Sequence, residues 1–473
     1  MKRLAVLSCI LSLGSLGLSG CTVGPRYQRP ALTIPAEHRG QVTPADAASF
    51  ADQAWWEVFH DSVLQDLIAE ALKNSSDVRL AAWRVEEARA NAGIVRSQVF
   101  PSVQGQAQTG YGRQNREQGG LIQYNVSAAW ELDLWGRIRH SNEAALADYL
   151  ATEEARRGVL LSLVSEVATR YFQLRELDLQ LEIARNTTGA FQETYNLFDQ
   201  RLQGGAASAL ETSSAEASLA ATAANIPDLE RQITAAENDL SFLLGRNPGP
   251  IARGAVLNDQ FLPPDVPPGL PSDLLERRPD LREAEQSLVA ANAGVGIANA
   301  DFFPRISLTG AFGGLSPRIS ELFPAGRTWS IAGGLLTPVF QGRRLREQHR
   351  AAVARWEQAR ARYEQRVTNA FGEVSTTLVA YQKFAEVEKE RTRAVAAYRE
   401  AFRLSNLRYT AGLSGYLEVL QSQQQLFPAE IQLAQARYNR LAALVQLYQV
   451  LGGGWQQIRQ TGGLARTDQT LVP

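Results

Sequence analysis

The sequence predicts a mixed α/β membrane protein built from a tandem-duplicated unit of strand, strand and very long helix. Three observations predict this fold class. The two halves of the chain match each other, one segment alternates strictly between apolar and polar residues, and two segments keep a helical period far beyond the length of an ordinary globular helix. We therefore expect four β-strands per chain, each pair followed by one long helix.

The duplication is visible when the second half of the chain is laid on the first. Matching segments lie 203 to 207 residues apart along almost the whole length, and a nearly constant spacing over so much sequence is not expected by chance. The repeating unit of roughly 200 residues is much longer than a solenoid repeat of about 20 to 50. The matched segments are 77–79 with 280–282, 100–101 with 303–304, 135–137 with 341–343, 201–205 with 408–412, and 244–245 with 451–452.

The clearest strand follows a helix expected over residues 77–99, which ends at Phe100 and Pro101 because proline disfavours helix for the residue before it. Over residues 124–134, apolar and polar residues then alternate. This period of two suits a membrane strand with lipid on one side and a wet lumen on the other, although a half-buried strand of a soluble sheet would show the same pattern. The apolar positions are Tyr124, Val126, Ala128, Trp130, Leu132 and Leu134, with weaker counterparts at Ile306, Leu308, Phe312, Trp329, Ile331 and Leu335.

Two very long helices follow the strands. Residues 137–203 contain no proline, and their apolar residues step by four and three, as in a coiled-coil seam. Helices of about 65 residues span roughly 100 Å at a rise of about 1.5 Å per residue. Glycine-containing turns at 203–205 and 410–412 lead into returning helices, which Pro227 and Pro428 should bend. The seam positions are Leu160, Val164, Val167, Tyr171 and Leu174, and then Tyr363, Val367, Ala370, Val374, Thr377, Tyr381 and Phe384.

Turn, proline and glycine signals define the boundaries of the parts. Loops at 113–122 and 315–327 should link the strands of each pair outside the cell. We expect a signal peptide at 1–20, a lipidated N-terminal segment and part of an equatorial region at 21–76, a first repeat at 77–245 with strands at about 101–112 and 123–135, a Pro-rich connector at 246–276, a second repeat at 277–452 with strands at about 304–314 and 328–340, and a C-terminal tail at 453–473.

The first residues form an export signal. Lys2 and Arg3 precede an apolar stretch over 4–18, which leads to Leu18-Ser19-Gly20-Cys21. This ending resembles the lipobox of bacterial lipoproteins, although an ordinary signal with a chance cysteine would look similar. The resemblance implies that Cys21 becomes the first mature residue and carries a diacylglycerol thioether and an N-acyl chain, typically palmitate. In lipoproteins generally, an Asp directly after this cysteine favours retention in the inner membrane. The residue here is Thr22, which allows sorting to the outer membrane.

Composition excludes several function classes. With 48 basic and 49 acidic residues, the chain has no basic stripe of the kind that a nucleic-acid binder needs. After residue 20, no stretch approaches the roughly 18 to 20 apolar residues of a spanning helix. We expect no metal, no cofactor beyond the lipid and no enzyme active site, because the four histidines share no metal-ligand spacing and are expected to be solvated or capping residues. These are His38, His60, His140 and His349.

The strand count predicts the oligomer. Four strands cannot close a membrane barrel, since the smallest need about eight. Two chains would give about eight strands, whose interior fills with side chains, whereas three give about twelve and leave a lumen. The count alone does not decide between them, but an open duct favours a homotrimer. We expect a trimeric 12-stranded β-barrel continued by a long α-helical coiled-coil periplasmic tunnel.

Four segments match a known family: 21–27 with Pro30, 55–72, 277–304, and the motif Arg408-Tyr409-Thr410-Ala411-Gly412. Through them the chain resembles the outer membrane factor family, the TolC-like exit ducts, and specifically its lipoprotein branch. The resemblance covers almost the whole mature chain. It implies a passive exit duct for drugs or other small molecules, lipid-anchored in the outer membrane and extending into the periplasm. A periplasmic adaptor protein and an inner-membrane pump, of RND type, would dock at the turns.

The resemblance also implies a gate at these turns. The family's closed state is held by polar and ionic links near the turns, and acidic rings narrow the bore. Glu211 and Glu418 both lie six residues after the matching glycines, and Tyr409 matches a tyrosine that links to the neighbouring helix pair. We predict Glu418, tripled by symmetry, as the constriction ring, and a hydrogen bond between Tyr409 and Glu211 as a latch. The residues expected to dock the adaptor are Gly204, Gly205, Arg408 and Gly412.

Two residues depart from the family's pattern at this gate. Gln421 stands where some members have a second ring of acids, and Ser414 stands where some have a linking arginine. The alternative is that Glu211, Glu418 and Tyr409 are solvated positions at helix ends.

Other functions are open on the sequence alone. A non-conducting periplasmic coiled-coil scaffold lipoprotein would explain the helices but not the alternating strand. An exported lipoprotein enzyme would need an assembled site, and residues 412–416 fail the nucleophile-elbow pattern because their last position is Tyr416. An exit duct for secreted protein or polysaccharide is also open, but the lipobox favours small-molecule efflux.

Overall fold

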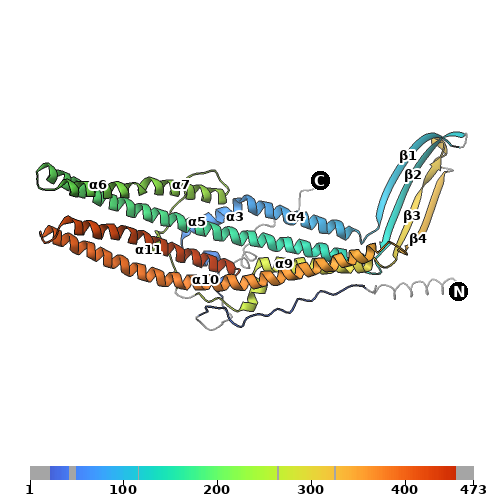
Figure 1. Cartoon of the computed structure of the whole chain (residues 1–473). Coiled ribbons are helices and arrows are strands. Elements are labelled where there is room, and N and C mark those ends of the chain that lie inside the picture. Colours follow the sequence, from blue (N-terminus) through green and yellow to red (C-terminus); the bar gives the residue numbers. More distant parts are fainter. Residues whose placement is uncertain (1–21, 42–48, 115–116, 264–265, 324–325, 454–473) are drawn as a thin grey trace. The chain divides into compact units, whose positions relative to one another are not determined.

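The computed structural model describes residues 22–41, 49–114, 117–263, 266–323 and 326–453 (Figure 1). The expected signal peptide, Cys21, and all but the first residue of the expected C-terminal tail lie outside these ranges. Within them, no helix combines the length and the apolar character needed to cross a membrane.

The chain forms two compact units, which we describe separately. Unit 1 takes residues 1–32, 83–154 and 282–366, and unit 2 takes residues 33–82, 155–281 and 367–473. Each unit therefore contains parts of both sequence repeats. The repeat is a unit of sequence but not of compact structure, because each of the two longest helices contributes residues to both units.

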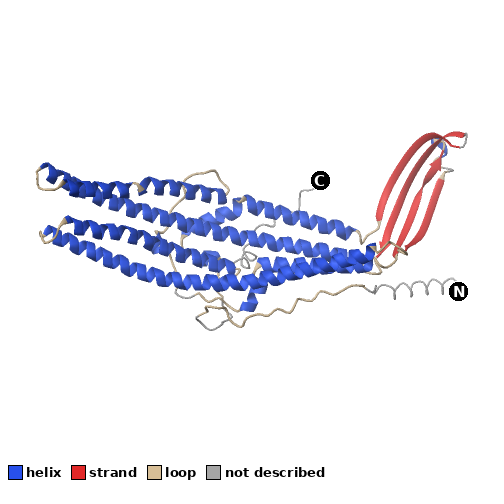
Figure 2. Ribbon diagram, in the orientation of Figure 1, coloured by secondary structure: helices blue, strands red, loops and turns tan. Residues whose placement is uncertain are grey.

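Unit 1 contains one antiparallel sheet, whose four strands pair in chain order (Figure 2). They are β1 (Ser102–Gln114), β2 (Glu117–Leu132), β3 (Arg305–Ser316) and β4 (Arg327–Leu336). Each strand reaches or exceeds the length of about 9 to 11 residues that a membrane strand needs. The four strands expected from the sequence are thus present.

The register of the sheet confirms the alternation. Val126 pairs with Phe312, which in turn pairs with Trp329, so apolar positions of three strands form one row. One residue further on, Ser127 lies opposite Gln104 of β1 on the other face. Since side chains alternate between the faces of a strand, one face of the sheet is apolar and the other polar.

The ends of the strands differ from the expectation in two places. The loop expected at 113–122 is mostly strand, because the ladder between β1 and β2 continues as far as the pair Gln114 and Glu117. The fourth strand was expected to reach residue 340 but ends at Leu336, two residues before Pro338. Proline cannot donate a hydrogen bond to a ladder, which explains the early end.

The two long helices are α5 (Arg137–Gln203) and α10 (Arg344–Thr410), each of 67 residues. At about 1.5 Å per residue, each spans roughly 100 Å. Most of the predicted seam positions are buried, as a coiled-coil seam requires. The buried ones are Val164, Val167, Tyr171, Leu174, Tyr363, Val367, Ala370, Val374, Thr377 and Tyr381.

The returning helices differ between the repeats. The second, α11 (Tyr416–Val450), continues through Pro428, whereas the first is divided into α6 (Ala209–Ala223) and α7 (Asn225–Leu243). Pro227 therefore does not bend a continuous helix but lies at the third position of α7, where the missing N–H has no intrahelical partner to lose. The Asn225 amide donates to the carbonyls of Ala221 and Thr222, which satisfies acceptors of the preceding turn.

Shorter elements complete the described ranges. They are η1 (Phe50–Asp52), α2 (Trp55–Val58), α3 (Ser62–Asn74), α4 (Ser76–Ser97), η2 (Leu257–Asp259), η3 (Pro271–Asp273), α8 (Leu274–Arg277), α9 (Pro279–Ala300) and η4 (Ile319–Glu321).

One carboxyl of α5 is buried in unit 2. Glu176 is only 4% exposed, and the Gln180 amide one turn away donates a hydrogen bond to it. Burial raises the pKa of Glu176 to about 7, against the opposing effect of that hydrogen bond. This carboxyl therefore titrates near neutral pH.

Candidate functional site at the hairpin turns

The first turn joins α5 to α6 in unit 2. Gly205 adopts φ of +72°, a left-handed conformation that glycine accepts without a steric cost. The Gly205 N–H donates to the Leu202 carbonyl at 3.0 Å, and the Ala206 N–H donates to the Arg201 carbonyl at 2.7 Å. This pair of hydrogen bonds is a Schellman motif, which satisfies the last carbonyls of α5 and reverses the chain.

The second turn, between α10 and α11, repeats this geometry. Gly412 also has φ of +72°. Its N–H donates to the Tyr409 carbonyl at 3.0 Å, and the Leu413 N–H donates to the Arg408 carbonyl at 2.8 Å. The two turns are therefore equivalent in backbone structure, and Arg201 and Arg408 hold equivalent positions in them.

The first acid, Glu211, is held by its own helix. Ser208 is the N-cap of α6, and its hydroxyl accepts the Glu211 N–H at 3.3 Å. The Glu211 carboxylate in turn accepts the Ser208 N–H at 2.9 Å and the Ser208 hydroxyl at 3.1 Å. This reciprocal arrangement is a capping box, which occupies the carboxylate locally.

The second acid, Glu418, has a different partner. The N-cap of α11 is Gly415, which offers no side chain to cap the helix. Glu418 instead forms an ion pair with Arg408, whose Nε lies 3.3 Å from a carboxylate oxygen, and both side chains are about half exposed. An exposed pair of this kind is weak, so Glu418 is available to other partners.

Tyr409 joins the two turns through Arg201. The Arg201 guanidinium donates to the Tyr409 hydroxyl and lies 5.8 Å from the centre of its ring, within the range of a cation–π interaction. Behind this contact, the Tyr409 ring meets Tyr416 edge-on at 5.6 Å, and Tyr416 packs on Phe198 at 4.4 Å. A row of rings thus connects the ends of α5 and α10 and the start of α11.

This row lies on a small apolar core that belongs to both hairpins. Large residues fixed in such a core position the turn side chains above it. Its buried members are Phe191, Phe198, Ala215, Tyr416, Val419 and Leu420, and Tyr195, Ala207, Leu219, Phe402 and Tyr409 pack against it.

The structure brings together some of the predicted gate residues. Arg408, expected only as a docking residue, is paired with Glu418. Within this chain, the described contacts of Tyr409 and Glu211 do not include a hydrogen bond between them, because Arg201 and Ser208 are their partners. Sequence reasoning missed both of these partners. Ser208 followed by Glu211 three residues later fits the capping-box pattern, and Arg201 aligns with Arg408 of the other repeat. The sequence therefore contained a pattern that could have identified each partner.

The turns also expose leucines. Leu210 is 76% exposed and Leu413 is 71% exposed, and Leu202, Leu407 and Leu417 are also exposed. Gathered apolar side chains of this kind mark interaction surfaces.

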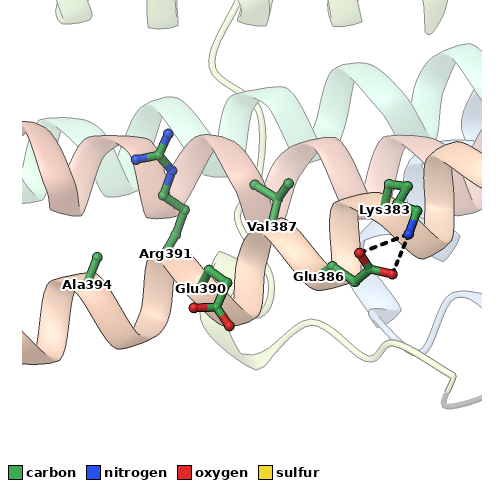
Figure 3. Close-up of a pocket in the computed structure, with 6 residues that line it drawn as sticks. All are labelled: Lys383, Glu386, Val387, Glu390, Arg391 and Ala394. Atoms are coloured by element: carbon green, nitrogen blue, oxygen red, sulfur yellow. Dashed lines mark hydrogen bonds and ion pairs between the residues drawn. The ribbon is translucent and has the colours of Figure 1, made fainter.

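Elsewhere, the described residues offer little chemistry. A concavity on α10 is lined by Lys383, Glu386, Val387, Glu390, Arg391 and Ala394 (Figure 3). The Lys383 ammonium donates to Glu386 at 2.7 Å. The other two charged residues of the lining, Glu390 and Arg391, have opposite signs, so the concavity has no net charge. We interpret it as a solvated helix face.

The histidines do not form a site either. In the part of the chain that the structure describes, no group of three or more His, Cys, Asp or Glu side chains is placed to hold a metal ion. The expectation that every histidine is solvated or caps a helix is wrong for His38 and His140, which are buried. Burial lowers the pKa of His38.

Comparison with known proteins gives consistent matches over most of the chain. The profile of a family described as outer membrane efflux protein matches residues 67–246 and 270–453. The probable efflux pump outer membrane protein TtgC of Pseudomonas putida is 36% identical over 470 residues, covering 96% of each chain. The cation efflux system protein CusC of Escherichia coli is 34% identical over 452 residues, covering 94% of this chain and 98% of CusC. The solved structure of the outer-membrane channel OprN superposes with a TM-score of 0.85 at 34% identity, covering 92% of this chain and 100% of OprN.

Proposed function

The chain belongs to the outer membrane efflux protein family, and we propose that it is the passive exit duct of a tripartite pump for drugs or other small molecules. As a member of this family it is an outer-membrane channel that extends into the periplasm, and it is not an enzyme. One observation carries the proposal. The same chain contains a sheet with one apolar face and two helices, each roughly 100 Å long, that end in hairpin turns. The apolar face suits lipid, and helices of that length suit a path through the periplasm.

The duct is a homotrimer in this proposal. β1 and β4 are the two edges of the sheet, and β4 is exposed along its whole length. Unpaired edges are ready to add another strand, so β4 of one copy can pair with β1 of the next. Three copies joined in this way provide about twelve strands around a lumen.

Glu418 is the proposed constriction residue. Three copies of an exposed carboxylate near one axis repel each other and favour cations over anions. The Arg408 guanidinium beside each of them reduces this repulsion, so the ring is held in place while Arg408 stays paired. Glu211 is not expected to join this ring, because its own helix cap occupies it.

The link between Arg201 and Tyr409 is the proposed latch. It connects the ends of α5 and α10, which belong to different hairpins of one chain. Separating the hairpins requires this contact to break, and the aromatic row behind it to slide. The Tyr409 to Glu211 hydrogen bond that the resemblance implies stays a prediction, and the Arg201 contact is proposed beside it as a latch within one chain.

Two further parts of the proposal concern attachment. Cys21 carries the lipid, as the lipobox resemblance implies, and several acyl chains at about 0.8 kcal/mol per buried methylene would anchor the chain firmly. A periplasmic adaptor protein and an RND-type inner-membrane pump engage the turns at Gly204, Gly205, Arg408 and Gly412. The exposed leucines beside these residues support the docking, because they offer an apolar surface.

Single-channel conductance in planar bilayers tests the duct and its gate together. We expect wild-type trimers to give mostly closed, cation-preferring events. Replacing Glu418→Ala should enlarge the events or remove much of the cation preference, since the ring loses its charge. The matched control is Glu211→Ala, the equivalent acid of the other hairpin, which should leave selectivity near the wild-type value.

Two results would count against these assignments. Equal selectivity in Glu418→Ala and the wild type would retain the duct and discard Glu418 as the constriction. An absence of conductance from folded, lipidated trimers would instead support a non-conducting scaffold.

A further inference from the structure

The N-terminal strap, residues 22–29, follows the expected lipid-bearing Cys21 and lies in unit 1 with the start of α5 and with α9. Hydrogen bonds and close contacts hold it along most of its length, although it forms no helix or strand. Residues near the ends of a chain are poorly ordered unless they are tied down, so these contacts need a reason.

The strap begins at the foot of the sheet. The Val23 N–H donates to the Trp135 carbonyl at 3.1 Å, and Trp135 lies three residues after the end of β2 at Leu132. Thr22 packs against Gly136, where an added Cβ would lie 2.7 Å from the Thr22 methyl group. Gly136 also has φ of +85°, so glycine is required here both for the turn and for the close approach.

A tight crossing follows at Gly24. A Cβ on Gly24 would lie 2.8 Å from the Cα of Gly296 in α9 and 2.9 Å from Nε2 of His140 in α5. A Cβ on Gly296 would lie 2.6 Å from the same imidazole. His140 is buried, and its Nδ1 lies 3.1 Å from a carboxylate oxygen of Glu143. The strap is thus fitted to the surface beneath it at the level of single atoms.

Polar contacts then hold the strap to α9. The Asn292 amide donates to the Pro25 carbonyl at 3.2 Å. Glu285 accepts the Tyr27 hydroxyl at 3.1 Å and two hydrogen bonds from the Arg29 guanidinium, at 2.7 and 2.6 Å. A bidentate guanidinium–carboxylate pair is among the stronger and more directional contacts of a protein surface.

The contacts on α9 follow one line. Glu285, Asn292 and Gly296 are separated by seven and four residues, a spacing that places them on one face of a helix. The strap runs antiparallel to α9 along this face, because its first residues meet Gly296 and its last meet Glu285. This face of α9 is a continuous track for the strap.

We propose that the strap is a fixed spacer that holds the acylated Cys21 at the periplasmic foot of the β-sheet, so that lipid and sheet enter the same membrane in register. The inference rests on the proposed lipidation of Cys21. Eight free residues would reach about 26 Å when extended, which is close to the roughly 30 Å thickness of the hydrocarbon core. Docking removes nearly all of this freedom, because the first contact comes one residue after Cys21.

A pair of insertions tests the spacer in the full chain. A ten-residue Gly-Ser segment placed after Thr22 frees the lipid from the docked strap, whereas the same segment placed after the exposed Thr33 leaves the lipid and the docked strap unchanged. We measure the rate at which pulse-labelled protein becomes resistant to urea extraction from outer membranes. The first insertion should slow this step about tenfold, because a longer tether lowers the effective concentration of the sheet at the membrane. The second should stay close to the wild-type rate.

The lipid dependence separates a spacer from a merely structural strap. Each insertion is repeated in a Cys21→Ala chain that is exported by a non-lipoprotein signal. A spacer predicts that the two insertions then integrate at equal rates, since there is no lipid to place. A delay after Thr22 that persists without the lipid, or equal rates for both insertions in the lipidated chain, would overturn the inference.

A substitution tests the track itself. Glu285→Ala should expose the strap to trypsin at Arg26 in the folded, lipidated protein and slow integration, and the matched control Glu283→Ala, on the same helix but paired with Arg366, should do neither. Cleavage and integration rates equal to those of the control would contradict the track. Mass spectrometry of Cys21 reports separately on the lipid, and an unmodified Cys21 would refute the lipidation and the spacer with it. The conductance measurement tests the proposed channel independently of the lipid and of the strap.

Discussion

The two hairpins of the chain share a backbone but use equivalent charges differently. α5 and α10 have the same number of residues, and the second residue after each helix is a glycine at φ of +72°. Six residues after each of these glycines comes a glutamate. In the first hairpin Ser208 caps the helix and occupies Glu211, whereas in the second the equivalent residue is Gly415, and Glu418 pairs with Arg408.

This difference shows which features the duplication constrains. The left-handed glycines and the length of the helices fix where both hairpins end, and both copies keep them. The cap residue affects only local stability, by about 1 kcal/mol, so it is free to differ. One such difference leaves an acid available in one hairpin and occupied in the other, which lets one repeat provide the proposed constriction and the other a fixed support.

The largest expected effect concerns the long helices. Glu176 of α5 is buried, whereas Lys383, at the equivalent position of α10, is exposed and pairs with Glu386. Because burial raises the pKa of Glu176 to about 7 from 4.5, the folded chain binds its proton more tightly than the unfolded chain does. The stabilising contribution is complete below about pH 4.5 and is lost as pH rises towards 7.

We therefore expect Glu176→Gln to be more stable than the wild type at pH 8, by on the order of 3 kcal/mol, and about equal to it at pH 4.5. Local hydrogen exchange of α5 amides at both pH values measures this difference. Lys383→Gln is the control and should show no such pH dependence. An equal gain at both pH values would mean that Glu176 does not titrate in this range.

The next effect concerns Arg201 and Arg408, the equivalent arginines of the two turns. Arg201→Gln removes both the hydrogen bond and the cation–π contact with Tyr409, a loss of about 1 to 2 kcal/mol. If this contact is the latch, that loss raises the open probability of single channels about tenfold. Arg408→Gln should mainly increase cation preference, since it frees Glu418, and should raise the open probability less than Arg201→Gln does. Similar open probabilities in the two variants would contradict a separate role for Arg201.

Much of this architecture was predictable from the sequence, because it depends on patterns that extend over many residues. The alternation around Val126 and Trp130 predicted the faces of the sheet, and the matched glycines Gly205 and Gly412 predicted where both hairpins turn. Such patterns carry redundant information, so a single exception does not hide them.

The partners of single side chains were less predictable. The family resemblance implied a hydrogen bond between Tyr409 and Glu211, but it did not indicate that Ser208 binds that carboxylate in a helix cap or that Arg201 lies over the Tyr409 ring. Such choices depend on competition between local and tertiary contacts. The docking of the strap on Glu285 was missed for a similar reason, because the two segments are 256 residues apart in sequence.

The smallest effect is the most direct test of the comparison, because it exchanges the two caps. Ser208→Gly removes the capping box and should cost α6 only a few tenths of a kcal/mol, since glycine is itself a tolerable N-cap. It should also free Glu211. Gly415→Ser should stabilise α11 by a similar amount and draw Glu418 from Arg408 into a new capping box.

The double variant should therefore exchange the roles of the two acids. The reversal potential of open channels in a salt gradient measures this exchange. Glu211→Ala, which should not change selectivity in the wild-type background, should reduce cation preference in the double variant. Glu418→Ala should reduce it less in the double variant than in the wild type. If Glu418 still dominates selectivity in the double variant, the position of each hairpin around the lumen, and not its cap, decides which acid forms the constriction.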